Sequence, residues 1–456
     1  MKLVLLGLLA ASATLALPLL GAIAAPPPEA TAAATGAFPF PVVERTLANG
    51  LHVYVVKFDS PGLVAYYSIV RTGSRNEVEP GKSGFAHFFE HMMFRGTDRY
   101  SQEAYNDEIK KMGADSNAFT SDDLTVYHIL AGTAALPKIV ELESDRFQHL
   151  KYKLPEFQKE ARAVLGEYNK SASDPLQRMY EVLQDNAFST HTYKHTTIGF
   201  LKDIEDMPNQ FDYSRTFFDR YYRPDNITLL IVGDVTPAEV LPLVEQHYGP
   251  WTKGPARPAI PAEPPQPKEK RVALDWKGPT LPILLEGWHV PGFSTSNVDL
   301  VALDVLAELV FSERAPLYKR LVIKEQKVQS LSGSNDTHVD PALFTVLSRV
   351  KNPADLGHVE QAIDEELARI AREGVDDKTL REILSNVHYS FAGGLSTSDR
   401  VASTASQYIA LGGTIDVINR YYAQYPKVTS ADVQRVARSY FKPENRTLVT
   451  LKRGAP

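Results

Sequence analysis

His87-Phe-Phe-Glu-His91 is the stretch on which the interpretation of this 456-residue chain depends. On a helix, which turns roughly 100° per residue, His87 and His91 lie about 40° apart and Glu90 about 60° to the other side of His87. Two imidazoles at this spacing can hold one metal ion, and the carboxylate then lies beside any water at that ion. The surrounding apolar residues predict a buried helix, and they are Phe85, Phe88, Phe89, Met92 and Met93.

A third ligand separates a metal site from a chance pattern. The five residues alone would also fit an ordinary core helix. A catalytic zinc site needs three protein ligands and an open fourth position. Glu167 follows His91 by 76 residues, inside the helix-like segment 157–170, and Glu160 lies two turns earlier on the same face. One of these carboxylates can bind the metal, and the other can orient a ligand by a hydrogen bond.

The combined pattern resembles a known family. An H-x-x-E-H motif is the inverzincin signature, and with a Glu 76 residues downstream it is similar to the pitrilysin, insulysin and mitochondrial processing peptidase family. Segments 87–97 and 222–234 also resemble that family, and the resemblance covers most of the chain after residue 40. The resemblance implies the zinc-bearing subunit of a bacterial two-domain type.

The resemblance also implies specific roles. Zn²⁺ would be held by His87, His91 and Glu167, with Glu160 orienting a ligand from behind, and Glu90 would be the general base of a metalloendopeptidase. The implied fold is α+β: two homologous domains, each an antiparallel sheet with helices mainly on one face, together forming half of a clamshell.

Composition narrows the class of protein. The chain is 43% hydrophobic and 23% charged with a formal net charge of −6, which is typical of a soluble globular protein. Its length of 456 residues predicts about two or three domains. Mild acidity argues against a nucleic-acid partner, and the absence of a long basic run argues against a polybasic membrane contact. The chain has no cysteine, so a zinc site must use His and carboxylate ligands.

The N-terminus has the features of an export signal. Met1-Lys2 precedes an apolar run from Leu3 to Leu20 and an A-x-A-like sequence that predicts cleavage after Ala24. We expect a signal peptide over 1–24, a disordered lead-in over 25–39, and a periplasmic protein without stable membrane insertion. The alternative is a retained anchor, because the run is nearly long enough to span a bilayer.

An internal repeat divides the chain. Residues 221–232 match 440–451 at an offset of 219, and the same offset aligns the strand-like segments 64–70 and 283–289. A duplicated domain explains both matches. We therefore expect a catalytic zinc domain over 40–253, a Pro-rich linker over 254–270, and a homologous non-catalytic domain over 271–456.

The repeat also shows that the metal motif occurs in the first half and not at the matching positions of the second. The offset places His87, Glu90 and His91 on apolar residues of a helix-like segment, which are Leu306, Leu309 and Val310. A core helix at this position needs no polar side chains, so their presence in the first half indicates a function.

Periodicity predicts an alternation of strands and long helices. Expected strands are 51–57, 63–71, 125–131 and 226–233. Expected helices are 101–112, 135–148, 156–186, 237–247, 356–373 and 378–392.

A substrate strand is implied by the resemblance. Segment 116–120 matches the family's edge strand, on which an extended peptide docks by β-augmentation. Asn117, Ala118 and Phe119 would then contact the peptide. The alternative is an ordinary turn at 115–117.

The second half departs from the family pattern. Active members carry an Arg and a Tyr seven residues apart that bind substrate and stabilise the oxyanion, whereas the matching positions here hold Val322 and Gln329. Lys319 or Arg320 could replace the Arg only after a register shift. The resemblance therefore implies a heterodimer in which a homologous subunit supplies the Arg/Tyr pair, with a homodimer as the alternative.

Two other functions remain to be separated from an endopeptidase. One is a non-catalytic scaffold or binding subunit, as some relatives of this fold are. The other is a metal-dependent hydrolase whose substrate is not a peptide, because a zinc site alone does not define the substrate.

Overall fold

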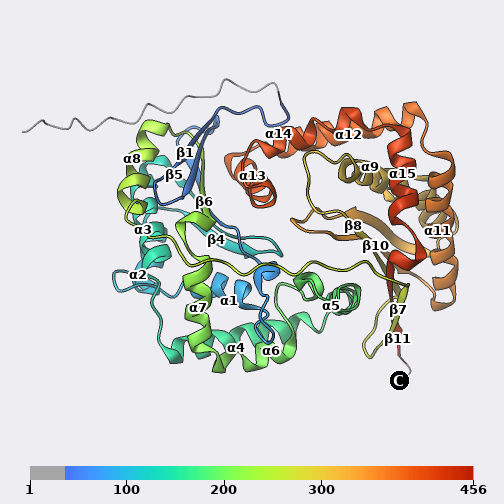
Figure 1. Cartoon of the computed structure of the whole chain (residues 1–456), viewed down its shortest axis with the longest axis horizontal. Coiled ribbons are helices and arrows are strands. Elements are labelled where there is room, and N and C mark those ends of the chain that lie inside the picture. Colours follow the sequence, from blue (N-terminus) through green and yellow to red (C-terminus); the bar gives the residue numbers. More distant parts are fainter. Residues whose placement is uncertain (1–35, 455–456) are drawn as a thin grey trace, which may run out of the picture.

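The computed structural model describes residues 36–454, which form two halves that lie side by side (Figure 1). The expected signal peptide and most of the expected lead-in fall outside these residues. Residues 36–39 are described, and there Phe38 is buried and its N–H donates to Asn419 Oδ1 (2.9 Å). No helix within residues 36–454 combines the length and the hydropathy needed to cross a bilayer.

The first half is built on a six-stranded sheet. Its strands follow the order β1-β2-β6-β3-β5-β4. The elements are β1 Val42–Thr46, β2 His52–Lys57, β3 Leu63–Val70, α1 Phe85–Met92, α2 Gln102–Lys111, β4 Asp115–Thr120, β5 Thr125–Gly132, α3 Leu136–His149, α4 Leu154–Ser171, α5 Pro175–Ala187, α6 Leu201–Asp206, α7 Phe211–Tyr221, β6 Ile227–Gly233 and α8 Pro237–Tyr248.

The second half is built on a five-stranded sheet in the order β7-β11-β8-β10-β9. Residues 254–269 lead into it without a helix or strand. The elements are β7 Lys270–Trp276, β8 Ile283–Val290, α9 Asp299–Phe311, α10 Pro316–Tyr318, a π-helical turn Lys319–Lys324, β9 Val328–Asn335, β10 Ala342–Val350, α11 Leu356–Glu373, α12 Asp377–Gly394, α13 Ser398–Gly412, α14 Val417–Tyr422, α15 Ser430–Tyr440 and β11 Arg446–Arg453.

The α+β prediction with two repeated units is confirmed. The aligned strands β3 and β8 are central in their sheets, and each is followed by the helix that the repeat aligns, α1 in one half and α9 in the other. Neither sheet is wholly antiparallel, because β2 pairs with β6, and β7 with β11, in parallel.

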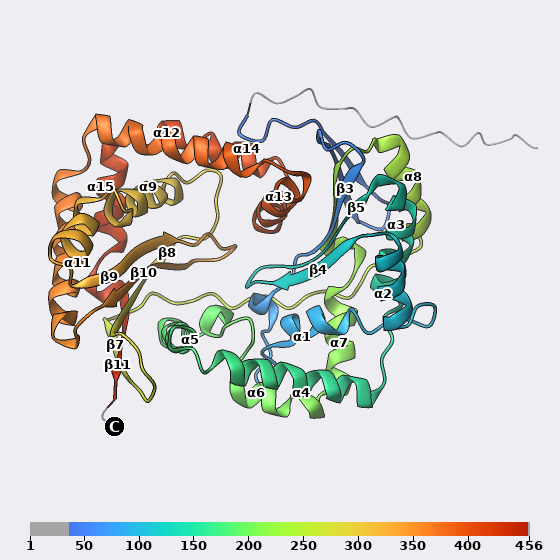
Figure 2. The same ribbon diagram turned by 180° about the vertical axis from the view of Figure 1, so that it is seen from behind.

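Each half covers the back of the other half's sheet. Tyr66 and Tyr67 on β3 point to opposite faces, and each face has its own core. The Tyr66 face packs on helices of the first half, whereas the Tyr67 face packs on α13 of the second half, where Tyr67 donates a hydrogen bond to Asp399 Oδ1 (2.8 Å). Figures 1 and 2 both show α13 against the first sheet and α5 below the second.

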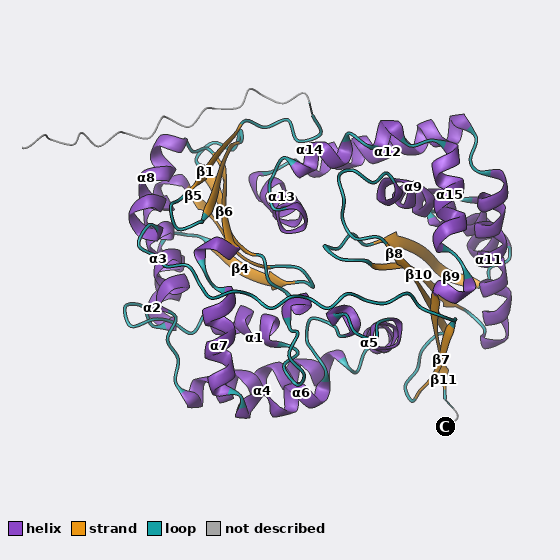
Figure 3. Ribbon diagram, viewed as in Figure 1, coloured by secondary structure: helices purple, strands orange, loops and turns teal. Residues whose placement is uncertain are grey.

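Helix α5 makes the reciprocal contact. It belongs to the first half, yet Met179 and Leu183 are buried against Leu285 of β8 and Val449 of β11. The two exchanged helices, α13 beside the first sheet and α5 below the second in Figure 3, tie the halves together through apolar cores.

One expected helix is wrong in its extent. Segment 156–186 was expected to be continuous, but it is two helices, α4 and α5, separated by residues 172–174. Asp174 caps the N-terminus of α5 by accepting from Leu176 N–H (2.8 Å), and Pro175 occupies the first helical position. A proline there has no N–H and favours a new helix start over continuation of the old one.

The alternative of an ordinary turn at 115–117 is wrong. Residues 115–120 form β4, which pairs with β5 and lies at the open edge of the first sheet.

Candidate metal centre

Helix α1 starts at a position that only glycine accommodates. Gly84 has φ +91°, and a Cβ there would lie 2.6 Å from the carbonyl oxygen of Ile198. The buried carboxylate of Glu77 accepts hydrogen bonds from the N–H groups of Gly84 (2.7 Å) and Ala86 (2.6 Å). Glu77 thereby satisfies free N–H groups of the first turn and fixes the start of the helix.

The apolar side of α1 holds the helix in the core. Phe88 and Phe89 are fully buried, and Phe88 packs edge-on against Phe157 of α4 at a centroid distance of 5.0 Å. The other side of α1 carries His87, Glu90 and His91, which are only partly buried.

Helix α4 brings Glu167 to the two histidines. Glu167 Oε2 lies 3.6 Å from His87 Nε2 and 3.5 Å from His91 Nε2. These separations are close to the roughly 3.3 Å expected between ligand atoms of a tetrahedral ion with bonds of about 2.0–2.1 Å. Among residues 36–454, this is the one group of three or more His, Asp or Glu side chains close enough to share an ion.

Glu160 lies behind His91. Its Oε1 is 2.9 Å from His91 Nδ1, and its other oxygen pairs with Arg95. A proton on His91 Nδ1 that is donated to Glu160 leaves Nε2 free on the side of Glu167. The carboxylate is 4% exposed, so the Arg95 guanidinium offsets the cost of burying its charge.

His87 is set up differently. Its Nδ1 is buried and has no hydrogen-bond partner. Burial and the neighbouring His91 lower the pKa of His87 to about 4, so the imidazole is neutral at pH 7, as a metal ligand must be. Nε2 is the atom that faces Glu167.

Glu90 is held beside this group by the edge strand. Thr120, the last residue of β4, donates from Oγ1 to Glu90 Oε2 (2.6 Å). Burial raises the pKa of Glu90, and the Thr120 hydrogen bond opposes that rise. A carboxylate with a raised pKa beside a metal group is suited to exchanging protons near neutral pH.

The expected substrate residues lie on the exposed edge of β4. Asn117 is exposed, and its Oδ1 accepts from the N–H of Ala118 (2.9 Å). Ala118 and Phe119 are half-buried. Because β5 covers only one edge of β4, the other edge can accept a further strand.

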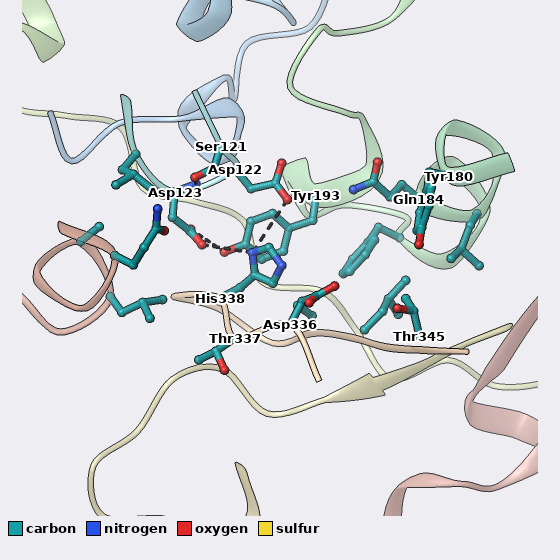
Figure 4. A pocket seen from close by; sticks show the side chains of 18 residues that line it. Ser121, Asp122, Asp123, Tyr180, Gln184, Tyr193, Asp336, Thr337, His338 and Thr345 are labelled. Carbon is teal, nitrogen blue, oxygen red and sulfur yellow. Dashed lines mark hydrogen bonds and ion pairs between the residues drawn. The ribbon is translucent and has the colours of Figure 1, made fainter. Parts of the chain in front are cut away.

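A cavity of 380 Å³ lies between the two halves, next to the end of β4 (Figure 4). Asp123, after β4, accepts from Tyr193 Oη (2.7 Å) and lies 3.1 Å from Nδ1 of His338 in the second half. Burial lowers the pKa of His338, but Asp123 and Asp122 raise it more, to about 9. None of the expected site residues lines this cavity, so it is distinct from the metal group.

The second half has apolar residues at the positions of the metal motif and does not have the Arg/Tyr pair at the matching positions. Leu306, Leu309 and Val310 are buried in α9. Val322 lies in the π-helical turn, and Gln329 is exposed on β9.

Of the two side chains that could replace the missing Arg after a register shift, one is already in an ion pair and the other is not. Arg320 Nε donates to Glu325 Oε1 (2.7 Å), whereas Lys319 is exposed without an ion pair within the described chain.

The contact between Glu160 and His91 gives a first prediction. Glu160→Gln should weaken zinc affinity by about 10- to 100-fold, because the neutral amide holds His91 less firmly and removes the charge that pairs with Arg95. Competition with a chromogenic chelator measures the change. Arg162→Gln, on the exposed face of the same helix, is the matched control. Equal affinity in the wild type and Glu160→Gln would show that Glu160 does not support the ligand.

Sequence reasoning missed Glu77 and Thr120. Glu77 lies ten residues before His87 in an irregular segment, and its role appears only when the helix start folds back onto it. Thr120 lies within the segment that matched the substrate strand, but only the packing of β4 on α1 brings its hydroxyl to Glu90.

Two family models match the chain. The model described as insulinase (peptidase family M16) matches residues 64–199, and the model described as the peptidase M16 inactive domain matches residues 210–387. The first match contains the metal group, and the second contains α9, where that group is absent.

Similar proteins include named proteases. The zinc protease PqqE of Helicobacter pylori is 28% identical over 414 residues, which is 89% of this chain and 92% of the relative. The human mitochondrial-processing peptidase subunit beta is 32% identical over 182 residues, which is 40% of this chain but only 36% of the relative.

Solved structures of proteases share the fold of this chain. A protease from Helicobacter pylori superposes with a TM-score of 0.82 at 30% identity, covering 90% of this chain and 98% of that one. The periplasmic protease PqqL of Escherichia coli has a TM-score of 0.75 at 18% identity, and the match covers 93% of this chain and 48% of that protein, which shows a shared fold. This chain belongs to the M16 family of peptidases.

Proposed function

We propose that this chain is the zinc-bearing subunit of a metalloendopeptidase that hydrolyses unstructured peptides. The observation that carries the proposal is the convergence of His87 Nε2, His91 Nε2 and Glu167 Oε2 at separations that suit zinc, with Glu90 adjacent. The relative PqqE of Helicobacter pylori is named a zinc protease, which supports the same chemistry.

Proton transfer in this proposal belongs to Glu90. Zinc, when bound, would polarise the peptide carbonyl and make a water molecule more acidic. Glu90 Oε2 is held by Thr120, and within the described chain Glu90 makes no other hydrogen bond. Oε1 can therefore take a proton from the attacking water and deliver it to the departing amine, so that the proton lost by water ends on the new N-terminus.

Substrate positioning in this proposal belongs to β4. An extended peptide would pair with the open edge of the strand, in contact with Asn117, Ala118 and Phe119. The strand ends at Thr120, which holds Glu90, so a peptide on this edge would lie beside the general base.

A partner subunit is part of the proposal. Val322 has no hydrogen-bond donor in its side chain, and Gln329 has neither charge nor phenol, so neither replaces the Arg or the Tyr. Loss of one oxyanion donor typically costs about 10² to 10³ in rate. We therefore infer a heterodimer in which a homologous subunit supplies the Arg/Tyr pair.

A periplasmic location completes the proposal. The N-terminal sequence has the pattern of a cleaved export signal. A relative with the same fold is described as the periplasmic protease PqqL.

The test is cleavage of a quenched, unstructured peptide by the chain alone and by the chain co-purified with a homologous M16 subunit that carries the Arg/Tyr pair. We expect about one zinc per chain in both samples and at least a roughly 10²-fold higher rate with the partner. Full activity of the chain alone would refute the need for a partner.

The same experiment addresses the other functions. Zinc binding without cleavage in any pairing would favour the scaffold, which the match to the inactive-domain model and the missing Arg/Tyr pair support. Cleavage of a non-peptide ester or amide in preference to peptides would favour a different hydrolase.

A further inference from the structure

The hydroxyl of Thr120 connects the substrate strand to the general base. Its Oγ1 donates to Glu90 Oε2 over 2.6 Å, which is short for a neutral donor and typical of a bond to a charged carboxylate. Glu90 is partly buried, and a bond of this kind restricts its orientation. Helix α1 and strand β4 supply one partner each, and the two elements pack on each other.

The Thr120 hydroxyl is committed to this bond. The next oxygen, Thr125 Oγ1, is 3.5 Å away, and Thr125 donates its own hydrogen to Thr72 O (2.9 Å). A hydroxyl has one hydrogen, so Thr120 gives it to the nearer, charged acceptor. The hydroxyl hydrogen of Thr120 is therefore donated to Glu90 and not to Thr125.

The backbone around Thr120 is anchored. Thr120 pairs with Thr125 across the turn that ends β4. The carbonyl of Asp122 in that turn accepts from Arg75 N–H (2.9 Å). Arg75 Nε in turn donates to Asp340 of the second half (2.5 Å). Thr120 is thus held at the point where the substrate edge, the metal helix and the junction of the halves meet.

The second half lacks both members of this pair. The repeat places Leu309 where the first half has Glu90. With β6 and β11 aligned at that offset, the strand registers of the two sheets make Asn335, the last residue of β9, the counterpart of Thr120. Where the carboxylate is replaced by an apolar side chain, the hydroxyl donor is replaced as well.

We propose that Thr120 is a positioning residue that fixes Glu90 Oε2 and leaves Oε1 directed at the reacting water. The inference rests on the proposed peptidase function. A rotating Glu90 would place its free oxygen correctly for only part of the time, and a displacement of 1 Å can cost about 10² in rate. The bond makes the register of the peptide strand and the orientation of the base parts of one rigid unit.

The test compares Thr120→Val with Thr120→Ser in the chain assembled with its partner subunit. Valine keeps the shape of threonine and removes the hydroxyl, whereas serine keeps the hydroxyl. We expect kcat to fall by about 10- to 100-fold in Thr120→Val with KM within about twofold, and to return to within about threefold of the wild type in Thr120→Ser. Zinc content should be unchanged in both variants.

Thr450→Val is the control for the general effect of this substitution in a strand. Thr450 is on β11 in the second half and makes no side-chain hydrogen bond within the described residues. Its activity should equal that of the wild type. Melting curves of all variants identify any loss of fold, and Thr120→Ala, which also removes the hydroxyl, takes the place of Thr120→Val if the valine variant is unstable.

The outcomes separate this inference from the proposed function. Equal kcat in Thr120→Val and the wild type, with Glu90→Gln inactive in the same assay, would overturn the role of Thr120 alone. A rise in KM without a fall in kcat would assign Thr120 to substrate binding and would also overturn it. An inactive wild type, or an active Glu90→Gln, would overturn the proposed function itself.

Discussion

Replacing Glu90 with Gln is expected to reduce peptide turnover by about 10² to 10⁴-fold while zinc remains bound. The amide cannot accept the proton of the attacking water, yet it has almost the shape of the carboxylate. Its oxygen can still accept from Thr120 Oγ1, so the local packing should survive. Initial rates on the quenched peptide, together with zinc content by mass spectrometry, measure the two quantities independently.

The specificity of this result depends on a matched carboxylate. Glu245→Gln removes an exposed carboxylate from α8 of the same half and should leave the rate unchanged. A Glu90→Gln variant with more than about one tenth of wild-type activity would remove Glu90 from the role of general base. A variant that lost its zinc would instead mean that Glu90 supports the metal.

Much of the fold was predictable because the sequence contains an internal repeat. The offset of 219 residues aligned β3 with β8 and α1 with α9, and the structure places both pairs in equivalent positions. The strand registers shift the match of β3 to β8 by one residue, to an offset of 218. The expected helices at 101–112, 237–247 and 356–373 are confirmed to within about two residues. Local periodicity is sufficient where an element has one apolar face and its own caps.

The exchange of α5 and α13 between the two halves could not be predicted from local periodicity. α5 and α13 each have an apolar face, but nothing in their local sequences specifies that this face covers the other half's sheet. The break at Asp174 and Pro175 is what allows α4 to stay with the metal helix while α5 crosses over. Partner choice is a tertiary property that one amphipathic pattern cannot specify.

The candidate site shows the same division. Helical spacing predicted His87 and His91 as one pair and Glu160 and Glu167 as another, and the family resemblance joined the two pairs in one site. The structure brings all four side chains together. Residues that act through loops or across the sheet were not predicted, because their distance in sequence from Glu90 carries no periodic signal. Thr120 is one example, 30 residues from its partner.

His87→Ala should remove zinc binding and turnover together. The substitution is cleaner than its equivalent at His91, because His87 Nδ1 has no hydrogen-bond partner whereas His91 also contacts Glu160. Only the Nε2 ligand atom is lost, so two protein ligands remain and zinc should fall from about one per chain to below about 0.1. Zinc raises the melting temperature of a protein that binds it only when folded. Added zinc should therefore raise the melting temperature of the chelator-treated wild type but not that of His87→Ala.

His388→Ala, at an exposed position on α12, is the control and should behave as the wild type. A zinc-dependent rise of equal size in His87→Ala would place the metal elsewhere, and the proposal that His87, His91 and Glu167 form its site would be wrong.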